Sequence, residues 1–167
     1  AVPSSSLANS RWQLRRIFRA LKTVDNAVTL GDFNMRAAEN GRIGAPYCDL
    51  WPALRPHDDG FTEDTSINLM RLDSKNKRRQ VRFDRVLLKG PRWSGASIDL
   101  LGTEPISSAH PRVFPSDHFG LQCRLVRRPE GLGYVVNLGP PTSAALACPV
   151  VFTVPVTSSA QCRRAVA

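Results

Sequence analysis

Two short polar clusters, each at one end of an apolar run, most constrain what this chain can fold into. The cluster 31–34 (Gly-Asp-Phe-Asn) follows the apolar run 27–30, and the cluster 115–118 (Pro-Ser-Asp-His) precedes the run 119–126. Short apolar runs bounded by turn-forming residues predict buried strands. The polar side chains therefore stand at strand ends. Clusters of Asp, Asn and His on strand ends suit metal-assisted hydrolysis of a phosphate ester.

The rest of the chain predicts one helix followed by several strands and long loops. Ser10 can cap a helix that runs to about Val24, with a buried stripe at i, i+3, i+4 and i+7 formed by Leu14, Ile17, Phe18 and Leu21. Gly31 is expected to allow a sharp turn at the end of the first strand. Further predicted elements are a short helix beginning within 48–51, an extended segment 61–68, strands 81–88 and 119–126, and a strand or turn at 98–102. This order favours an α/β or α+β layered domain.

Three regions are expected along the 167 residues: a polar opening segment 1–9, a domain 10–127 and a tail 128–167. From Gly131 to Ala167 there is no Asp or Glu, and four prolines interrupt the stretch. We expect this tail to lie outside the core, with an added β-ribbon as the less favoured alternative. The start, Ala1-Val2-Pro3, has no features of a signal peptide and suggests a chain cut from something longer.

The charge balance indicates a polyanionic partner. With 23 Lys and Arg against 14 Asp and Glu, the formal net charge is +9. We expect nucleic acid first and an anionic membrane surface second, the alternative being a basic domain that is merely kept soluble. The cluster Lys75–Arg79 could serve nuclear import or phosphate binding, or could be a solvated hairpin loop. No apolar stretch predicts a membrane span.

The four cysteines do not form a C-x-x-C pair, so neither a zinc site nor a disulfide framework is expected. A reducing, intracellular compartment is the default for such a chain.

The two clusters supply candidate roles. Asp32 is placed to accept a proton from water, and Asn34 offers an amide to a phosphate oxygen. Asp117 suits a hard divalent cation such as Mg²⁺, and His118 could donate to a phosphate oxygen as charge develops. Each residue also has a structural alternative: a turn aspartate, a backbone-capping asparagine, or a structural Asp-His pair.

Asp84 stands inside the otherwise apolar strand 81–88. A buried carboxylate needs a partner. Two partners are equally plausible on the residues alone: the imidazole of His118, which Asp84 would orient, or a salt bridge with Arg82 or Arg85.

Three segments, Gly31–Asn34, Arg82–Arg85 and Ser116–His118, resemble the endonuclease/exonuclease/phosphatase superfamily. Segments 98–104 and 112–121 are similar to its tyrosyl-DNA phosphodiesterase branch, and segments 49–51 and 62–68 fit the same pattern. The resemblance covers roughly residues 10–127.

The resemblance implies a four-layer α/β sandwich with the site at the sheet edges. It also implies Mg²⁺ or Mn²⁺, and hydrolysis of the 5′-phosphotyrosyl bond between DNA and trapped topoisomerase, a nuclear repair reaction. By motif, Asp32 would activate water, and Asp117 would reach the metal directly or through water. Asp84 would brace His118. Contacts with the substrate phosphate would come from Asn34, Asn68 and His118.

Two departures from the family pattern change the expectation. The family domain begins with a half that supplies an Asn and the main metal-binding Glu, whereas here no acidic residue precedes Asp25. Glu63 stands where close relatives carry an aromatic residue, so contact with the DNA end is in question. We therefore expect an uncovered sheet face and little or no turnover by this chain alone.

Other functions remain open. One is an abasic-site endonuclease or an inositol or lipid phosphatase of the same superfamily. Another is a non-catalytic fragment that binds nucleic acid.

Overall fold

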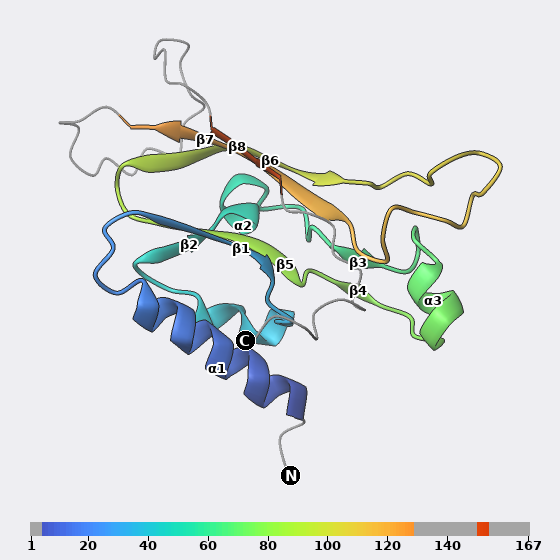
Figure 1. Ribbon diagram of the computed structural model, residues 1–167, viewed down its shortest axis with the longest axis horizontal. Helices are drawn as coiled ribbons and strands as arrows, with labels where there is room; N and C mark the ends of the chain where they lie inside the picture. The colour runs from blue at the N-terminus through green and yellow to red at the C-terminus, as the bar shows by residue number, and fades with distance from the viewer. Residues whose placement is uncertain (1–4, 129–149, 154–167) are drawn as a thin grey trace, which may run out of the picture.

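The computed structural model describes residues 5–128 and 150–153, and these form three antiparallel sheets, with α1 on one side of the β1-β5-β2 sheet and α2 on its other side (Figure 1). In chain order the elements are α1 (Ser5–Ala20), β1 (Ala27–Asp32), the 3₁₀ helix η1 (Ala37–Arg42), β2 (Tyr47–Asp49), α2 (Leu50–Leu54), β3 (Glu63–Asp64), α3 (Met70–Lys75), β4 (Gln80–Val81), β5 (Asp84–Lys89), β6 (Trp93–Leu101), β7 (Gly120–Arg127) and β8 (Val150–Thr153). The strand orders are β1-β5-β2, β3-β4 and β6-β7-β8. The mixed helix and strand composition confirms the predicted α/β class.

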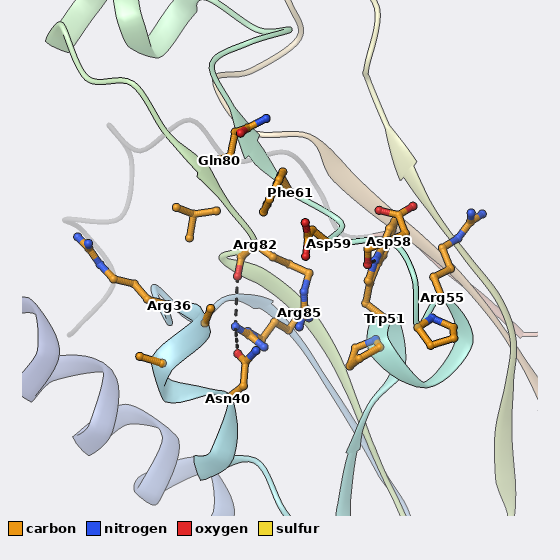
Figure 2. Close-up of a pocket in the computed structure, with 15 residues that line it drawn as sticks. Arg36, Asn40, Trp51, Arg55, Asp58, Asp59, Phe61, Gln80, Arg82 and Arg85 are labelled. Carbon is orange, nitrogen blue, oxygen red and sulfur yellow. Dashed lines mark hydrogen bonds between the residues drawn. The ribbon is translucent and has the colours of Figure 1, made fainter.

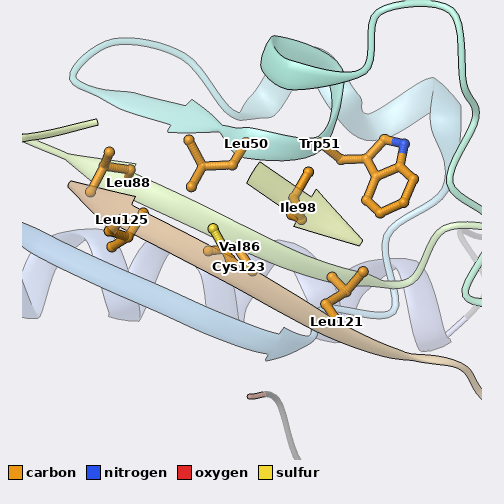
Figure 3. Packing of buried hydrophobic residues seen from close by; sticks show 8 residues of the cluster. All are labelled: Leu50, Trp51, Val86, Leu88, Ile98, Leu121, Cys123 and Leu125. Atoms are coloured by element: carbon orange, nitrogen blue, oxygen red, sulfur yellow. The ribbon is translucent and has the colours of Figure 1, made fainter. Parts of the chain in front are cut away.

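Strand β5 is the middle strand of its sheet, and its two faces contribute to two different hydrophobic cores. Successive side chains of a strand point to opposite faces. Val86 and Leu88 belong to the cluster shared with β6, β7 and α2, whereas Leu87 belongs to the cluster under α1. Figure 3 shows the first cluster: Leu50, Trp51, Val86, Leu88, Ile98, Leu121, Cys123 and Leu125. The described residues therefore stack as helix, sheet and sheet.

The buried stripe of the first helix is confirmed. Leu14 is 4% exposed, and Ile17, Phe18 and Leu21 pack against its cluster. The predicted bounds were wrong, since α1 is already formed at Ser5 and ends at Ala20, so Ser10 is not a cap. Just past this end, the Lys89 ammonium donates to the carbonyls of Leu21, Lys22 and Val24 at 2.7, 3.2 and 2.5 Å. A lysine from β5 thus holds the turn that follows the helix.

The predicted turn at Gly31 is wrong. β1 continues through Gly31, which has φ 139°, and Asp32 still pairs with Asp84 on β5. The left-handed residue is Asn34, with φ 50°.

The predicted strand 81–88 is two strands with different partners. Val81 of β4 pairs with Glu63 of β3, and Asp84 of β5 pairs with Asp32 of β1. The chain leaves one sheet and enters another at 82–83, a change of partner that a local pattern does not record.

Other bounds also differ from the sequence prediction. The short helix predicted to begin within 48–51 is confirmed as α2, which begins at Leu50 after Asp49, whose carboxylate accepts from the Trp51 N–H at 3.4 Å, while Cys48 lies in β2. Strand β6 begins at Trp93, five residues before the predicted 98, and has an irregularity between Gly95 and Ser97.

Within the predicted tail, β8 adds a strand to β7, with Gln122 opposite Thr153. Residues 150–153 thus pair with the core sheet as a single strand, whereas the alternative considered for the tail was a β-ribbon. The remaining tail, like residues 1–4, lies outside the described residues. Among the described helices, none is long and apolar enough to cross a membrane.

Candidate active site

The centre of the candidate site is a contact between Asp84 and His118. The Nδ1 atom of His118 lies 2.9 Å from Oδ2 of Asp84. Of the two partners considered for Asp84, the structure gives the imidazole. Arg82 and Arg85 instead bind Asp49, with guanidinium–carboxylate distances of 2.8 and 2.7 Å.

Asp32 stands beside this pair because β1 and β5 place it directly opposite Asp84. The N–H of Asn34 donates to its Oδ1 atom at 2.7 Å. Partial burial among neighbouring side chains raises the pKa of Asp32 above its ordinary value, the hydrogen bond from Asn34 lowers it, and the charge of Asp84 raises it further. The balance leaves the pKa raised, which brings a carboxylate nearer to what a general base needs.

The turn that carries His118 is fixed by local hydrogen bonds. The His118 N–H donates to Oγ of Ser116 at 3.1 Å, and that hydroxyl lies 3.3 Å from Oδ1 of Asp117. The Arg71 guanidinium lies 3.2 Å from Oδ2 of Asp117. Asp117 and His118 are thus adjacent but face different partners.

Thr62 joins the two halves of the site, a role that the sequence analysis missed. Its hydroxyl oxygen accepts from the N–H groups of Phe83 and Asp84, at 3.0 and 3.1 Å. Its carbonyl accepts from the Phe119 N–H at 2.7 Å. One buried threonine therefore fixes the strand that carries Asp84 to the segment that carries His118.

Glu63 is the second residue that was missed as part of the site. Its side chain is 1% exposed, and its Oε2 lies 3.5 Å from Nε2 of His118. Arg79 and Arg71 lie 3.4 and 3.5 Å from its two oxygens. Burial raises the pKa of Glu63, but the hydrogen bond with His118 and the charges of Arg79 and Arg71 outweigh burial and lower it.

His118 is an imidazolium held between two carboxylates. Burial opposes its charge, but the hydrogen bonds with Asp84 and Glu63 outweigh burial and raise the pKa of His118 to about 10. The ring also stacks on Phe83, with centroids 5.9 Å apart. Such a group can donate a hydrogen bond to an anion and can balance charge that develops on it.

The two asparagines predicted to bind substrate, Asn34 and Asn68, differ in exposure and in hydrogen-bond partners. Asn34 is exposed beside Asp32. Asn68 is 1% exposed, its amide donates to the Ser116 carbonyl at 2.7 Å, and its Oδ1 accepts from the Met70 N–H at 3.1 Å. The predicted substrate contact of Asn68 stays a prediction, and in this geometry both ends of its amide bind backbone groups. Asn68 holds the turn that carries His118.

The donor groups of the site bear on the expected metal ion. Within 5–128 and 150–153, no three His, Cys, Asp or Glu side chains are grouped to hold a metal ion. Asp117, the predicted ligand, is paired with Arg71, and Asp84 is paired with His118. The described residues by themselves do not fit a metal centre.

No protein-family model matches the chain. It is 32% identical over 124 residues to tyrosyl-DNA phosphodiesterase 2 of Gallus gallus, an alignment that covers 67% of this chain and 32% of that protein. It is 31% identical over 125 residues to the Homo sapiens protein, covering 68% and 33%. The crystal structure of D. rerio TDP2 complexed with single strand DNA product has a TM-score of 0.62 at 25% identity, covering 75% of this chain and 52% of that one. Truncated Caenorhabditis elegans TDP2 gives 0.52 at 27% identity, covering 68% and 44%.

The chain belongs to the tyrosyl-DNA phosphodiesterase 2 family. It spans about a third of the length of the curated tyrosyl-DNA phosphodiesterase 2 proteins that it matches. The predicted resemblance is confirmed at this level.

The basic cluster 75–79 reaches Glu63, the carboxylate beside His118, through one of its members. Lys75, Lys77 and Arg78 are exposed where α3 leads into β4. Arg79 is not part of that exposed set, because it turns towards Glu63.

A separate pocket of about 430 Å³ lies between η1, α2 and β4 (Figure 2). Its lining includes Arg36, Asn40, Trp51, Arg82 and Arg85, but not Asp32, Asp84 or His118. The Arg85 guanidinium donates to Oδ1 of Asn40 at 2.7 Å and to the Arg82 carbonyl at 3.3 Å. These contacts, with the Asp49 ion pairs, tie the two arginines into the fold.

Proposed function

We propose that this chain carries the Asp32, Asp84 and His118 part of a phosphodiesterase site that cleaves the 5′-phosphotyrosyl bond of DNA. The observation that carries the proposal is the 2.9 Å contact between Asp84 and His118, with Asp32 opposite Asp84 on β1. Family membership and the net charge of +9 support a DNA substrate. The D. rerio TDP2 structure that resembles this chain holds a single strand DNA product.

In this proposal each residue has one task. Asp32 accepts a proton from the attacking water, and Asn34 donates its amide to a phosphate oxygen. His118 donates from Nε2 to another phosphate oxygen, while Asp84 holds the ring through Nδ1. The role of Asp84 is positioning, because it acts through His118.

A divalent cation, Mg²⁺ or Mn²⁺, would offset the negative charge of the substrate phosphate. Asp117 is the proposed ligand, directly or through water, but it cannot act alone. The 167 residues contain no acidic residue before Asp25, where the family pattern has its metal-binding Glu. We therefore propose that the chain alone turns over phosphotyrosyl DNA slowly or not at all. We further propose that residues 10–127 form the C-terminal part of a four-layer sandwich that acts in nuclear DNA repair.

The test is a chimaera in which the matched segment of the Gallus gallus relative is replaced by residues 10–127. Cleavage of a 5′-phosphotyrosyl oligonucleotide in Mg²⁺ is expected, together with a fall of about 10²-fold or more on His118→Ala. Asp59→Asn, an exposed aspartate outside the site, is the control. A folded chimaera that retains full rate with His118→Ala would contradict the assignment.

The same chimaera separates the alternatives within the superfamily. An abasic duplex and inositol phosphates are assayed at equal concentration. Preference for either over phosphotyrosyl DNA would replace the proposed substrate.

A second candidate, non-catalytic binding of nucleic acid, is favoured by the exposed cations Lys75, Lys77 and Arg78 beside the site. Binding through phosphates weakens with salt in proportion to the number of contacts. The triple change to Ala is expected to weaken single-strand DNA binding several-fold at low salt and to flatten the salt dependence. Unchanged binding would leave these residues as a solvated loop.

A further inference from the structure

Three cations converge on the buried carboxylate of Glu63. His118, Arg79 and Arg71 lie 3.5, 3.4 and 3.5 Å from its oxygens. These distances are at the long limit for hydrogen bonds between charged groups. The Oε1 atom of Glu63 and the Nε atom of Arg71 are buried without a hydrogen-bond partner among the described residues.

The loose fit follows from the shape of the carboxylate. Its two oxygens must serve three donors, so His118 and Arg79 share Oε2 while Oε1 has only the long contact with Arg71. A terminal phosphate monoester or inorganic phosphate carries at least one more terminal oxygen than a carboxylate, and guanidinium and imidazolium donors bind phosphate well. The three donors are therefore better matched to such a phosphate than to the Glu63 carboxylate that they contact here.

The donors can be reached from solvent even though Glu63 cannot. The side chains of Arg71, Arg79 and His118 are 20, 23 and 14% exposed, against 1% for Glu63. Only the side chain of Glu63 has to move, so its pairing with Val81 and the backbone hydrogen bonds of Thr62 are kept. An anion can approach from the exposed edges of the cations while the carboxylate moves aside.

We propose that His118, Arg71 and Arg79 form a phosphate-binding site that Glu63 occupies as an internal competing anion, so that Glu63 sets how tightly this site takes a phosphate group. The inference rests on the proposed function only in its assignment of His118 to the substrate phosphate. Arg71 and Arg79 extend the contact surface for phosphate beyond the residues that the motif pattern contains.

The experiment measures binding of inorganic phosphate to the 167-residue chain by calorimetry and by the rise in Tm with phosphate concentration. Glu63→Gln keeps the shape of the side chain and removes its charge. It is expected to bind phosphate at least 10-fold more tightly than the unchanged chain. Glu104→Gln, at an exposed position, removes the same charge and is expected to change binding less than 2-fold.

Two further variants keep the inference falsifiable. Glu63→Asp retains the charge but shortens the side chain, and an intermediate gain is expected if Glu63→Gln does not fold. Adding Arg71→Gln or Arg79→Gln to Glu63→Gln is expected to remove most of the gain. Equal phosphate affinity in the unchanged chain and in folded Glu63 variants would overturn the inference.

A 5′-phosphorylated oligonucleotide, titrated alongside inorganic phosphate, separates two sources of the same chemistry. A larger gain for the oligonucleotide assigns the site to a DNA end. An equal gain assigns it to free phosphate. A gain in phosphate affinity without phosphotyrosyl cleavage by the chimaera would uphold this inference and defeat the proposed function, whereas cleavage without a gain would do the reverse.

Discussion

The imidazole of His118 is bound at both ring nitrogens, with Nδ1 2.9 Å from Asp84 and Nε2 3.5 Å from Glu63. The two contacts differ in consequence. The first orients the ring, and the second holds the nitrogen that would face a substrate phosphate.

Replacing Asp84 with Asn is expected to lower the pKa of His118 and to reduce the free energy of unfolding by about 1–3 kcal/mol, because a charge-assisted hydrogen bond is lost. Proton NMR titration of the His118 ring and urea unfolding are the measurements. Asp59→Asn, an exposed change of the same kind, is expected to alter neither quantity. An unchanged His118 titration in Asp84→Asn would show that the contact does not influence the ring.

The stability of the fold is expected to fall as pH rises above neutrality. The folded pKa of His118 is about 10, whereas an unperturbed imidazole titrates near 6.5. A raised pKa means that the stabilisation is fully present below about 6.5 and is lost as pH rises through about 10. Since each tenfold change in proton affinity corresponds to about 1.4 kcal/mol, the loss is at most about 5 kcal/mol.

Urea unfolding of the chain and of His118→Gln at intervals from pH 6 to pH 10 checks this expectation. The variant is expected to be less stable at pH 6 and to have a flatter profile. Parallel profiles for the two proteins would remove His118 as the cause.

Replacing Thr62 is expected to lower the free energy of unfolding far more than replacing Thr29 of β1. Its hydroxyl oxygen accepts from two backbone N–H groups, whereas the Thr29 hydroxyl is buried with no hydrogen-bond partner among the described residues. Thr62→Val is expected to cost about 2–4 kcal/mol, because two buried donors lose their acceptor. Thr29→Val is expected to be neutral or slightly stabilising, because it removes a buried polar group that makes no bond. Comparable losses of unfolding free energy in the two variants would contradict this account.

Periodicity and strand-end position were enough to predict part of this molecule. The stripe at Leu14, Ile17 and Phe18 was predictable because 3.6-residue spacing reports one buried face directly. Asp84 was recognisable as a partnered carboxylate because it interrupts an apolar strand, although the sequence could not choose between His118 and the neighbouring arginines.

The features that the sequence could not reveal depend on pairing between distant segments of the chain. The break at 82–83 arises because β4 pairs with β3 and β5 pairs with β1, and neither partner is encoded locally. Glu63 was noticed only as a departure from a motif. Its contact with His118 spans 55 positions of sequence and needs the tertiary fold. Asn68 matched the motif in type but is turned to backbone partners.

Gly60 lies just before Thr62 and Glu63 in the chain, and its backbone is packed against the Trp51 ring. Replacing Gly60 tests that packing. It has φ 62°, and a Cβ placed there would lie 2.1 Å from the Trp51 ring. That ring is 2% exposed and fixed by a hydrogen bond from its N–H to the Asp58 carbonyl at 2.9 Å. Gly60→Ala is therefore expected to cost about 2–4 kcal/mol, because both the backbone conformation and the space favour glycine.

Gly44→Ala is the matched control, because a Cβ there meets nothing within 4 Å and its φ is not positive. It is expected to change the free energy of unfolding by less than about 1 kcal/mol. Urea unfolding measures both variants, and the His118 NMR titration reports whether the damage reaches the site. A Gly60→Ala chain as stable as Gly44→Ala would mean that the loop 55–61 does not pack on Trp51 in solution.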